Sequence, residues 1–149
     1  MKVKIYLDTS VFSAYHDDAV KERQDLTVDF WNRRSEFELS TSALAIQELE
    51  DTPDVTKRDL FKVLTKGLFI HPVTEEAKVL GMQYITKGVF TEAMKDDSVH
   101  VAIAVLNRQD ILLSWNFKHL VNRRRRANIN DINISLGLPQ IEILAPPEV

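Results

Sequence analysis

The sequence contains no cysteine. Disulfide bonds, thiolate-bound zinc and a thiol nucleophile are therefore excluded, and any chemistry must use oxygen or imidazole groups. Long apolar runs are also missing: none approaches the length of a membrane span, and the apolar stretch within residues 1–8 is too short for a signal peptide. We therefore expect a cytoplasmic protein that does not enter a membrane.

Glycine and proline are scarce, with four and five residues in a chain of 149, and there is no excess of positive charge. The formal net charge of −3 argues against a protein that coats nucleic acid through bulk positive charge, although residues 123–126 form a run of four arginines. With 44% hydrophobic and 28% charged residues, the composition is that of an ordinary globular protein. We expect one domain over residues 1–149.

Short apolar segments alternate with longer helical patterns along the chain. Strands are predicted near residues 3–7, 37–40, 68–70, 110–115 and 141–144. Helices are predicted near residues 18–34, 43–50, 55–66, 74–87, 96–106 and 128–136. Strands separated by helical patterns of about 10 to 15 residues indicate an α/β domain, with a mainly parallel sheet and helices on both faces.

Two adjacent acids, Asp96 and Asp97, begin a predicted helix that is apolar on nearly every side. Such a helix belongs in a core, so acids at its start need either a capping role or counter-charges. Side chains at adjacent helix positions point about 100° apart and cannot both address one small site. We expect Asp96 to be the N-cap and Asp97 to point into a cleft, with a solvated Asp97 as the alternative.

Several polar side chains are predicted to meet at one edge of the sheet. Functional groups of open parallel sheets gather beyond the carboxyl ends of the strands. Asp8 follows the first strand and Asn116 follows the fourth, and the helix that begins with Asp97 runs antiparallel to that fourth strand. All three should therefore lie at the same edge, provided that the two strands are neighbours. Glu48 would have to point toward the same cleft, and Glu50 is the alternative.

A site of three carboxylates and one amide presents only oxygen ligands, which suit Mg²⁺ or Mn²⁺ rather than zinc or copper. The carboxylates repel one another, and a bound cation relieves that repulsion. A metal centre of this kind can activate water for attack on a phosphodiester. Lys118, His119, Arg123 and Arg124 are candidates for holding substrate phosphates, while a solvated helix face is the alternative for the arginine run.

Four blocks of the sequence resemble the PIN domain family, which includes the VapC toxin ribonucleases. They are Leu7-Asp8-Thr9-Ser10-Val11-Phe12, Ser42 followed by Glu48, Asp97-Ser98-Val99-His100-Val101-Ala102, and Leu113-Ser114-Trp115-Asn116-Phe117-Lys118-His119-Leu120. The resemblance implies a three-layer α/β/α fold with four to five mainly parallel strands. It also implies that Asp8, Glu48 and Asp97 bind Mg²⁺ or Mn²⁺ in an endoribonuclease that hydrolyses RNA.

Asn116 departs from the family pattern, because many relatives have a fourth acid there. An amide oxygen can ligate a metal or position a water, but it supplies no charge. The alternative is therefore a PIN-like module that binds nucleic acid or protein without strong catalysis. His100, one turn after Asp97, is expected to be a core residue or a hydrogen-bond partner of Asp97. The resemblance also implies an antitoxin partner, and we expect a homodimer.

Overall fold

Five short strands form one sheet in the order β3-β2-β1-β4-β5, and all neighbouring strands are parallel. The strands are β1 (Val3–Leu7), β2 (Phe37–Ser42), β3 (Phe69–His71), β4 (Ile111–Leu113) and β5 (Glu142–Leu144). The structure, a computed structural model, describes residues 1–149. The predicted α/β fold with a parallel sheet of four to five strands is confirmed.

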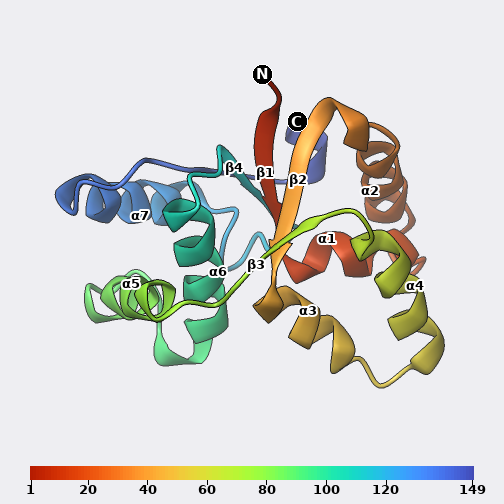
Figure 1. The fold of residues 1–149 in the computed structure, drawn as a ribbon, viewed down its shortest axis with the longest axis horizontal. Coiled ribbons are helices and arrows are strands. Elements are labelled where there is room, and N and C mark those ends of the chain that lie inside the picture. The colour runs from red at the N-terminus through yellow and green to blue at the C-terminus, as the bar shows by residue number, and fades with distance from the viewer.

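Helices cover both faces of the sheet (Figure 1). They are α1 (Thr9–Ser13), α2 (Lys21–Asn32), α3 (Ala43–Glu50), α4 (Val55–Thr65), α5 (Glu75–Thr86), α6 (Lys95–Leu106) and α7 (Arg123–Ser135). Helices α1 to α4 lie on one side and α5 to α7 on the other, so the domain has three layers. No helix has the length and apolar character that a membrane span requires.

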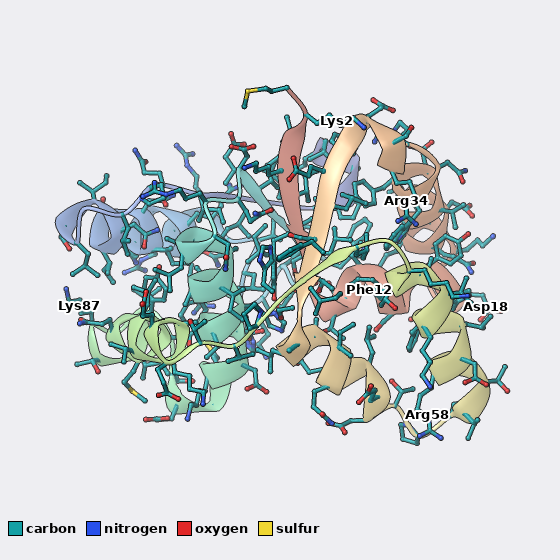
Figure 2. The ribbon with its side chains drawn as sticks, in the orientation of Figure 1. Lys2, Phe12, Asp18, Arg34, Arg58 and Lys87 are labelled. Carbon is teal, nitrogen blue, oxygen red and sulfur yellow. The ribbon has the colours of Figure 1, made fainter.

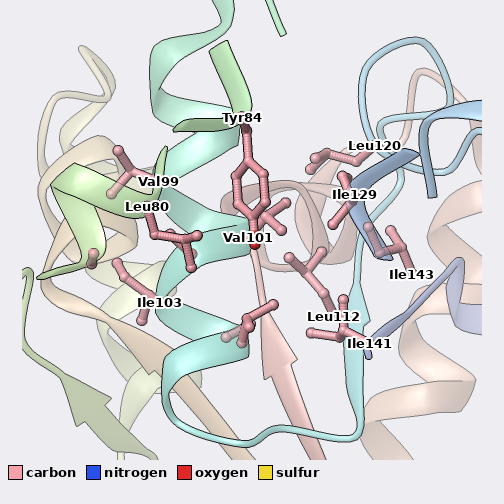
Figure 3. Packing of buried hydrophobic residues seen from close by; sticks show 14 of the residues in the cluster. Leu80, Tyr84, Val99, Val101, Ile103, Leu112, Leu120, Ile129, Ile141 and Ile143 are labelled. Carbon is pink, nitrogen blue, oxygen red and sulfur yellow. The ribbon is translucent and has the colours of Figure 1, made fainter. Parts of the chain in front are cut away.

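The side chains of the central strands alternate between two hydrophobic cores. Ile5 and Leu7 of β1 belong to the core under α1 to α4, whereas Tyr6 belongs to the core under α5 to α7. Figure 3 shows the second core, where β4 and α6 pack with α5 and α7. Charged side chains such as Lys2, Arg58 and Lys87 project from the rim instead (Figure 2).

Helix α6 lies in the core, as its uniformly apolar sequence predicts, and residues 98–105 are all buried. Its closest neighbour is α5, which approaches it at Gly81. A Cβ atom on Gly81 would lie 3.2 Å from both Ser98 Oγ and Val99 Cγ2, tighter than ordinary packing. The absence of a side chain on Gly81 therefore sets the distance between α5 and the start of α6.

Two predictions about helix starts are wrong. The N-cap of α6 is Met94, so Asp96 lies inside the exposed first turn and caps nothing. Helix α7 begins at Arg123 rather than near residue 128, because the Asn122 side chain accepts a hydrogen bond from the Arg125 N–H and caps the helix there. The arginine run therefore forms the first turn of α7.

Candidate functional site

The strand order of the sheet reverses at β1. Strands β2 and β3 extend from one side of β1, and β4 and β5 extend from the other. Open α/β sheets bind their ligands at such a switch point, beyond the carboxyl ends of the strands. Asp8 follows β1 here, and its backbone N–H donates to the Leu113 carbonyl at the end of β4. Asp8 therefore lies at the switch point.

Asp8 is buried and accepts three hydrogen bonds. Its Oδ1 accepts from the Ser10 N–H (3.0 Å) and from Ser10 Oγ (2.5 Å), and its Oδ2 accepts from Ser114 Oγ (2.5 Å). Burial raises the pKa of Asp8, and the charge of His100 and the bonds from Ser10 and Ser114 oppose this effect. A buried carboxyl group with a raised pKa is a common feature of functional sites.

Asn116 joins the same edge through Ser114, as the strand ends predict. The Asn116 N–H donates to Ser114 Oγ over 2.9 Å, and that hydroxyl in turn donates to Asp8. The Asn116 side-chain oxygen accepts the His119 N–H over 2.9 Å, so it organises the loop after β4.

Glu48 also reaches this edge from α3. Its Oε1 accepts from Thr9 Oγ1 (2.8 Å) and from His100 Nε2 (2.5 Å). Burial raises the pKa of Glu48, but the hydrogen bonds from His100 and Thr9 and the charge of His100 outweigh it, so that the net shift is downward. Glu50, the alternative, lies elsewhere and lines a pocket between α3 and α4.

His100 connects Glu48 to Tyr6 rather than to Asp97. Its Nδ1 lies 2.7 Å from the Tyr6 hydroxyl, which lies 2.7 Å from Ser42 Oγ at the start of α3. Because a carboxylate can only accept, the His100 Nε2 atom carries the proton of the bond to Glu48. His100 is therefore a buried core residue with both ring nitrogens hydrogen-bonded, as one of the two expectations states, and the alternative hydrogen bond to Asp97 is absent.

The charges of all three acids act on His100. Burial alone would lower its pKa, but the hydrogen bond and charge of Glu48, with smaller effects of Asp8 and Asp97, raise it. All three carboxylates therefore favour the protonated form of His100.

Asp97 faces the loop after β4 and is not free in solvent. Its Oδ2 lies 2.9 Å from His119 Nδ1, and both side chains are partly exposed. From the sequence, His119 is predicted only to hold substrate phosphates. Its pairing with Asp97 joins residues 22 positions apart, and no local pattern of the sequence indicates it.

In donor chemistry, Asp8, Glu48 and Asp97 fit a hard divalent cation, since all three are oxygen ligands. No three Asp, Glu or His side chains form a ligand group in this structure, however. Each carboxylate is hydrogen-bonded to its own protein donors. Glu48 Oε2 and Asp97 Oδ1 accept no hydrogen bond from the protein. Metal binding by these residues remains a prediction.

The arginine run divides into two pairs with different surroundings. Arg125 donates to the carbonyls of Val89 and His119, and Arg126 donates to the Ile143 carbonyl of β5. These two side chains connect α7 to the turn after α5, to the loop after β4 and to β5. The Arg123 and Arg124 side chains are exposed and form no hydrogen bond or ion pair, so their role as substrate contacts stays a prediction. Lys118 is exposed as well.

No family model and no curated sequence matches the chain, whereas solved structures share its fold. VapBC2 from Rickettsia felis is 10% identical with a TM-score of 0.61, and the match covers 96% of this chain and 98% of that one. VapBC-1 from nontypeable Haemophilus influenzae is 13% identical with a TM-score of 0.61 over 97% and 99%. VapC20 from Mycobacterium tuberculosis, a toxin that cleaves the sarcin-ricin loop, is 15% identical with a TM-score of 0.62 over 77% and 92%.

The chain has a VapC-like PIN fold. The predicted three-layer α/β/α fold class and the resemblance to the PIN fold are confirmed.

Proposed function

We propose that this protein is a divalent-metal-dependent endoribonuclease that hydrolyses RNA phosphodiester bonds. The main support is that Asp8 lies at the switch point of the sheet, where hydrogen bonds connect it through Ser114, Asn116 and His119 to Asp97, while Glu48 is held by the neighbouring Thr9. The sarcin-ricin loop cleaved by VapC20, which has the same fold, adds support for RNA as the substrate.

Asp8, Glu48 and Asp97 would hold Mg²⁺ or Mn²⁺, which when bound supplies Lewis acidity and an activated water. The chain's own residues orient these acids. Ser10 and Ser114 fix Asp8, Thr9 and His100 fix Glu48, and His119 fixes Asp97. The Asn116 side chain accepts a hydrogen bond from the His119 backbone and so supports the His119–Asp97 pair indirectly.

Cleavage of RNA by the purified protein in Mg²⁺ or Mn²⁺ tests the proposal, with a chelator as the control. Asp97→Asn keeps the shape of the side chain and removes its charge. We expect a rate loss of more than about 100-fold, since changes even to residues that only support a metal ligand cost up to that much. Asp96→Asn makes the same change at the adjacent exposed position and should leave the rate unaltered. Undiminished cleavage by Asp97→Asn would refute the assignment.

Asn116 favours a second candidate, a PIN-like module that binds nucleic acid or protein with little catalysis. The amide contributes no charge where many family members have a fourth acid. Calorimetric titration with Mn²⁺ separates the candidates. The nuclease should bind Mn²⁺ with measurable heat and lose that heat in Asp8→Asn, whereas the binding module should show neither heat nor metal-dependent cleavage.

We further propose that the protein is the toxin of a toxin–antitoxin pair, acts in the cytoplasm and forms a homodimer. Two of the structures that share its fold are VapBC toxin–antitoxin proteins. Exposed apolar side chains on α4 and β3, including Val63 (59% exposed) and Phe69 (64% exposed), offer a surface for a protein partner. Light scattering of the isolated chain tests the dimer, and rescue of growth by a neighbouring gene product tests the antitoxin.

A further inference from the structure

A polar cleft lies between the turn after α5 and the first turns of α7. It has a volume of about 340 Å³ and is lined by Gly88, Val89, Asn122, Arg124, Arg125 and Asn128. An adjoining cavity of about 300 Å³ continues past Asn128 to Lys87 and Asp131, whose charges are opposite. The first cavity alone has the size of a small-ligand pocket.

The charged groups of the first cavity are two guanidinium groups, with no acid among its lining residues. Arg125 is fixed in place: it donates to the carbonyls of Val89, Lys118 and His119, and it stacks 5.2 Å from the Phe90 ring. Its position gives the cleft a rigid wall. The positive charge there is therefore built into the fold.

The remaining donors of the cleft have no partner in the protein. The Arg124 guanidinium and the Asn128 amide form no hydrogen bond or ion pair, and both residues are exposed. Gly88 leaves the opposite wall open, because a Cβ atom there would meet nothing within 4 Å. A group with negative charge and several acceptor oxygens, such as a phosphate, can pair with both donors.

The cleft lies next to the candidate active site. The His119 carbonyl accepts from Arg125 over 2.8 Å, and the His119 ring lies 2.9 Å from Asp97. His119 thus contacts both Arg125, which forms a wall of the cleft, and Asp97, a candidate metal ligand. The cleft and Asp97 therefore flank the same residue, His119.

We propose that this cleft binds a backbone phosphate of the RNA substrate, close to the phosphate that is cleaved, through Arg124 and Asn128. The proposal rests on the ribonuclease function proposed above and adds a location for substrate binding. It assigns the binding role to Arg124 and leaves Arg125 as the residue that shapes the cleft.

The affinity for a short fluorescent single-stranded RNA, measured by anisotropy over a range of salt concentrations, tests this inference. All proteins carry Asp97→Asn so that cleavage does not interfere. Loss of one phosphate contact in Arg124→Gln should make the dependence of log affinity on log salt shallower by about 0.7. Affinity at low salt should fall by up to about fivefold. Asn128→Asp, which places a carboxylate in the cleft, should weaken binding further.

Arg108→Gln is the matched control. Arg108 is exposed and follows the far end of α6, beside the amino ends of β1 and β4, so its loss should leave the salt dependence unchanged. Equal slopes for the parent and Arg124→Gln, or equal reductions in Arg124→Gln and Arg108→Gln, would overturn the cleft assignment and leave the ribonuclease proposal intact. A wild-type protein that neither binds nor cleaves RNA would overturn both.

Discussion

The Nε2 atom of His100 lies 2.5 Å from Oε1 of Glu48, and this bond ties α6 to α3 across 52 residues of sequence. The other ring nitrogen faces the Tyr6 hydroxyl of β1. Three elements are therefore joined through one buried imidazole, and the direction of the Glu48 carboxylate is set by the core rather than by the surface of α3.

Removing His100 and Glu48 singly and together should reveal a coupling in the free energy of unfolding. His100 is 3% exposed and Glu48 32%, whereas the comparable pair His119 and Asp97 is 29% and 22% exposed. Hydrogen bonds to charged groups contribute about 1.5–3 kcal/mol when buried and less when solvent screens them. Double-mutant cycles with His100→Leu and Glu48→Ala, measured by urea unfolding at neutral pH, should therefore give about 1–2 kcal/mol.

The cycle for His119→Leu and Asp97→Ala is the control and should give less than about 1 kcal/mol. Equal coupling in the two pairs would show that burial of His100 does not strengthen its bond to Glu48.

Tyr6→Phe should destabilise the protein although it removes a single oxygen atom. The Tyr6 hydroxyl lies between Ser42 Oγ and His100 Nδ1, both 2.7 Å away, and burial raises the pKa of Tyr6. Its loss leaves two buried polar atoms without their partner, which costs about 1–3 kcal/mol of unfolding free energy. Tyr15→Phe is the matched control, because no hydrogen bond involves the Tyr15 hydroxyl, and it should change stability by less than about 0.5 kcal/mol. Identical midpoints of urea unfolding for both variants would contradict this view.

Asp8→Asn should separate stability from activity. Burial raises the pKa of Asp8, so the ionised form is the one that the fold disfavours at neutral pH. Asparagine keeps the shape and an acceptor for Ser10, and the Ser114 hydroxyl can rotate to pair with the new amide. We therefore expect a melting temperature that is unchanged or higher, together with loss of RNA cleavage.

Asp8→Ala provides the comparison for that variant. It leaves the donors of Ser10 and Ser114 unpaired and should cost about 1–3 kcal/mol. If asparagine destabilised the protein as much as alanine does, the negative charge itself would be holding the loop.

The sheet edge that gathers Asp8 and Asn116 could be predicted from the sequence because it depends on local signals. Apolar segments mark the strands, and a polar residue directly after a strand must emerge at its carboxyl end. Ser42 and Thr74 cap α3 and α5, and both are residue types that are favoured at helix starts. Local signals thus suffice wherever a residue's role is determined by its own element.

The partners within the site could not be predicted, because they depend on how distant elements pack. Nothing near His100 indicates that it faces Glu48 and Tyr6 rather than Asp97, since helical spacing favours its neighbour one turn away. The arginine run shows the same limit. Its sequence looks uniform, yet Arg125 and Arg126 bind backbone carbonyls while Arg123 and Arg124 do not. Only the direction of each side chain from α7 distinguishes them.

Stability at acidic pH should depend on His71 of the edge strand β3. His71 is 7% exposed, packs against the Phe69 and Tyr6 rings, and has a buried Nε2 atom with no hydrogen-bond partner. Burial lowers its pKa, so the folded protein keeps the ring neutral while the unfolded chain takes up a proton below about pH 6.5. The stabilisation is therefore fully present above pH 6.5 and is lost as the pH falls toward the lowered pKa.

His71→Leu removes this group and should flatten the pH dependence of the unfolding free energy between about pH 7.5 and pH 5. One proton changes the unfolding free energy by at most about 1.4 kcal/mol per pH unit. The slopes of unfolding free energy against pH for the parent and for His71→Leu should therefore differ by no more than this amount. At pH 7.5 the variant should be at least as stable as the parent, because leucine leaves no buried nitrogen unpaired. Urea unfolding of both proteins across this range measures the difference, and parallel curves would show that His71 takes up a proton equally well in the folded and unfolded chains.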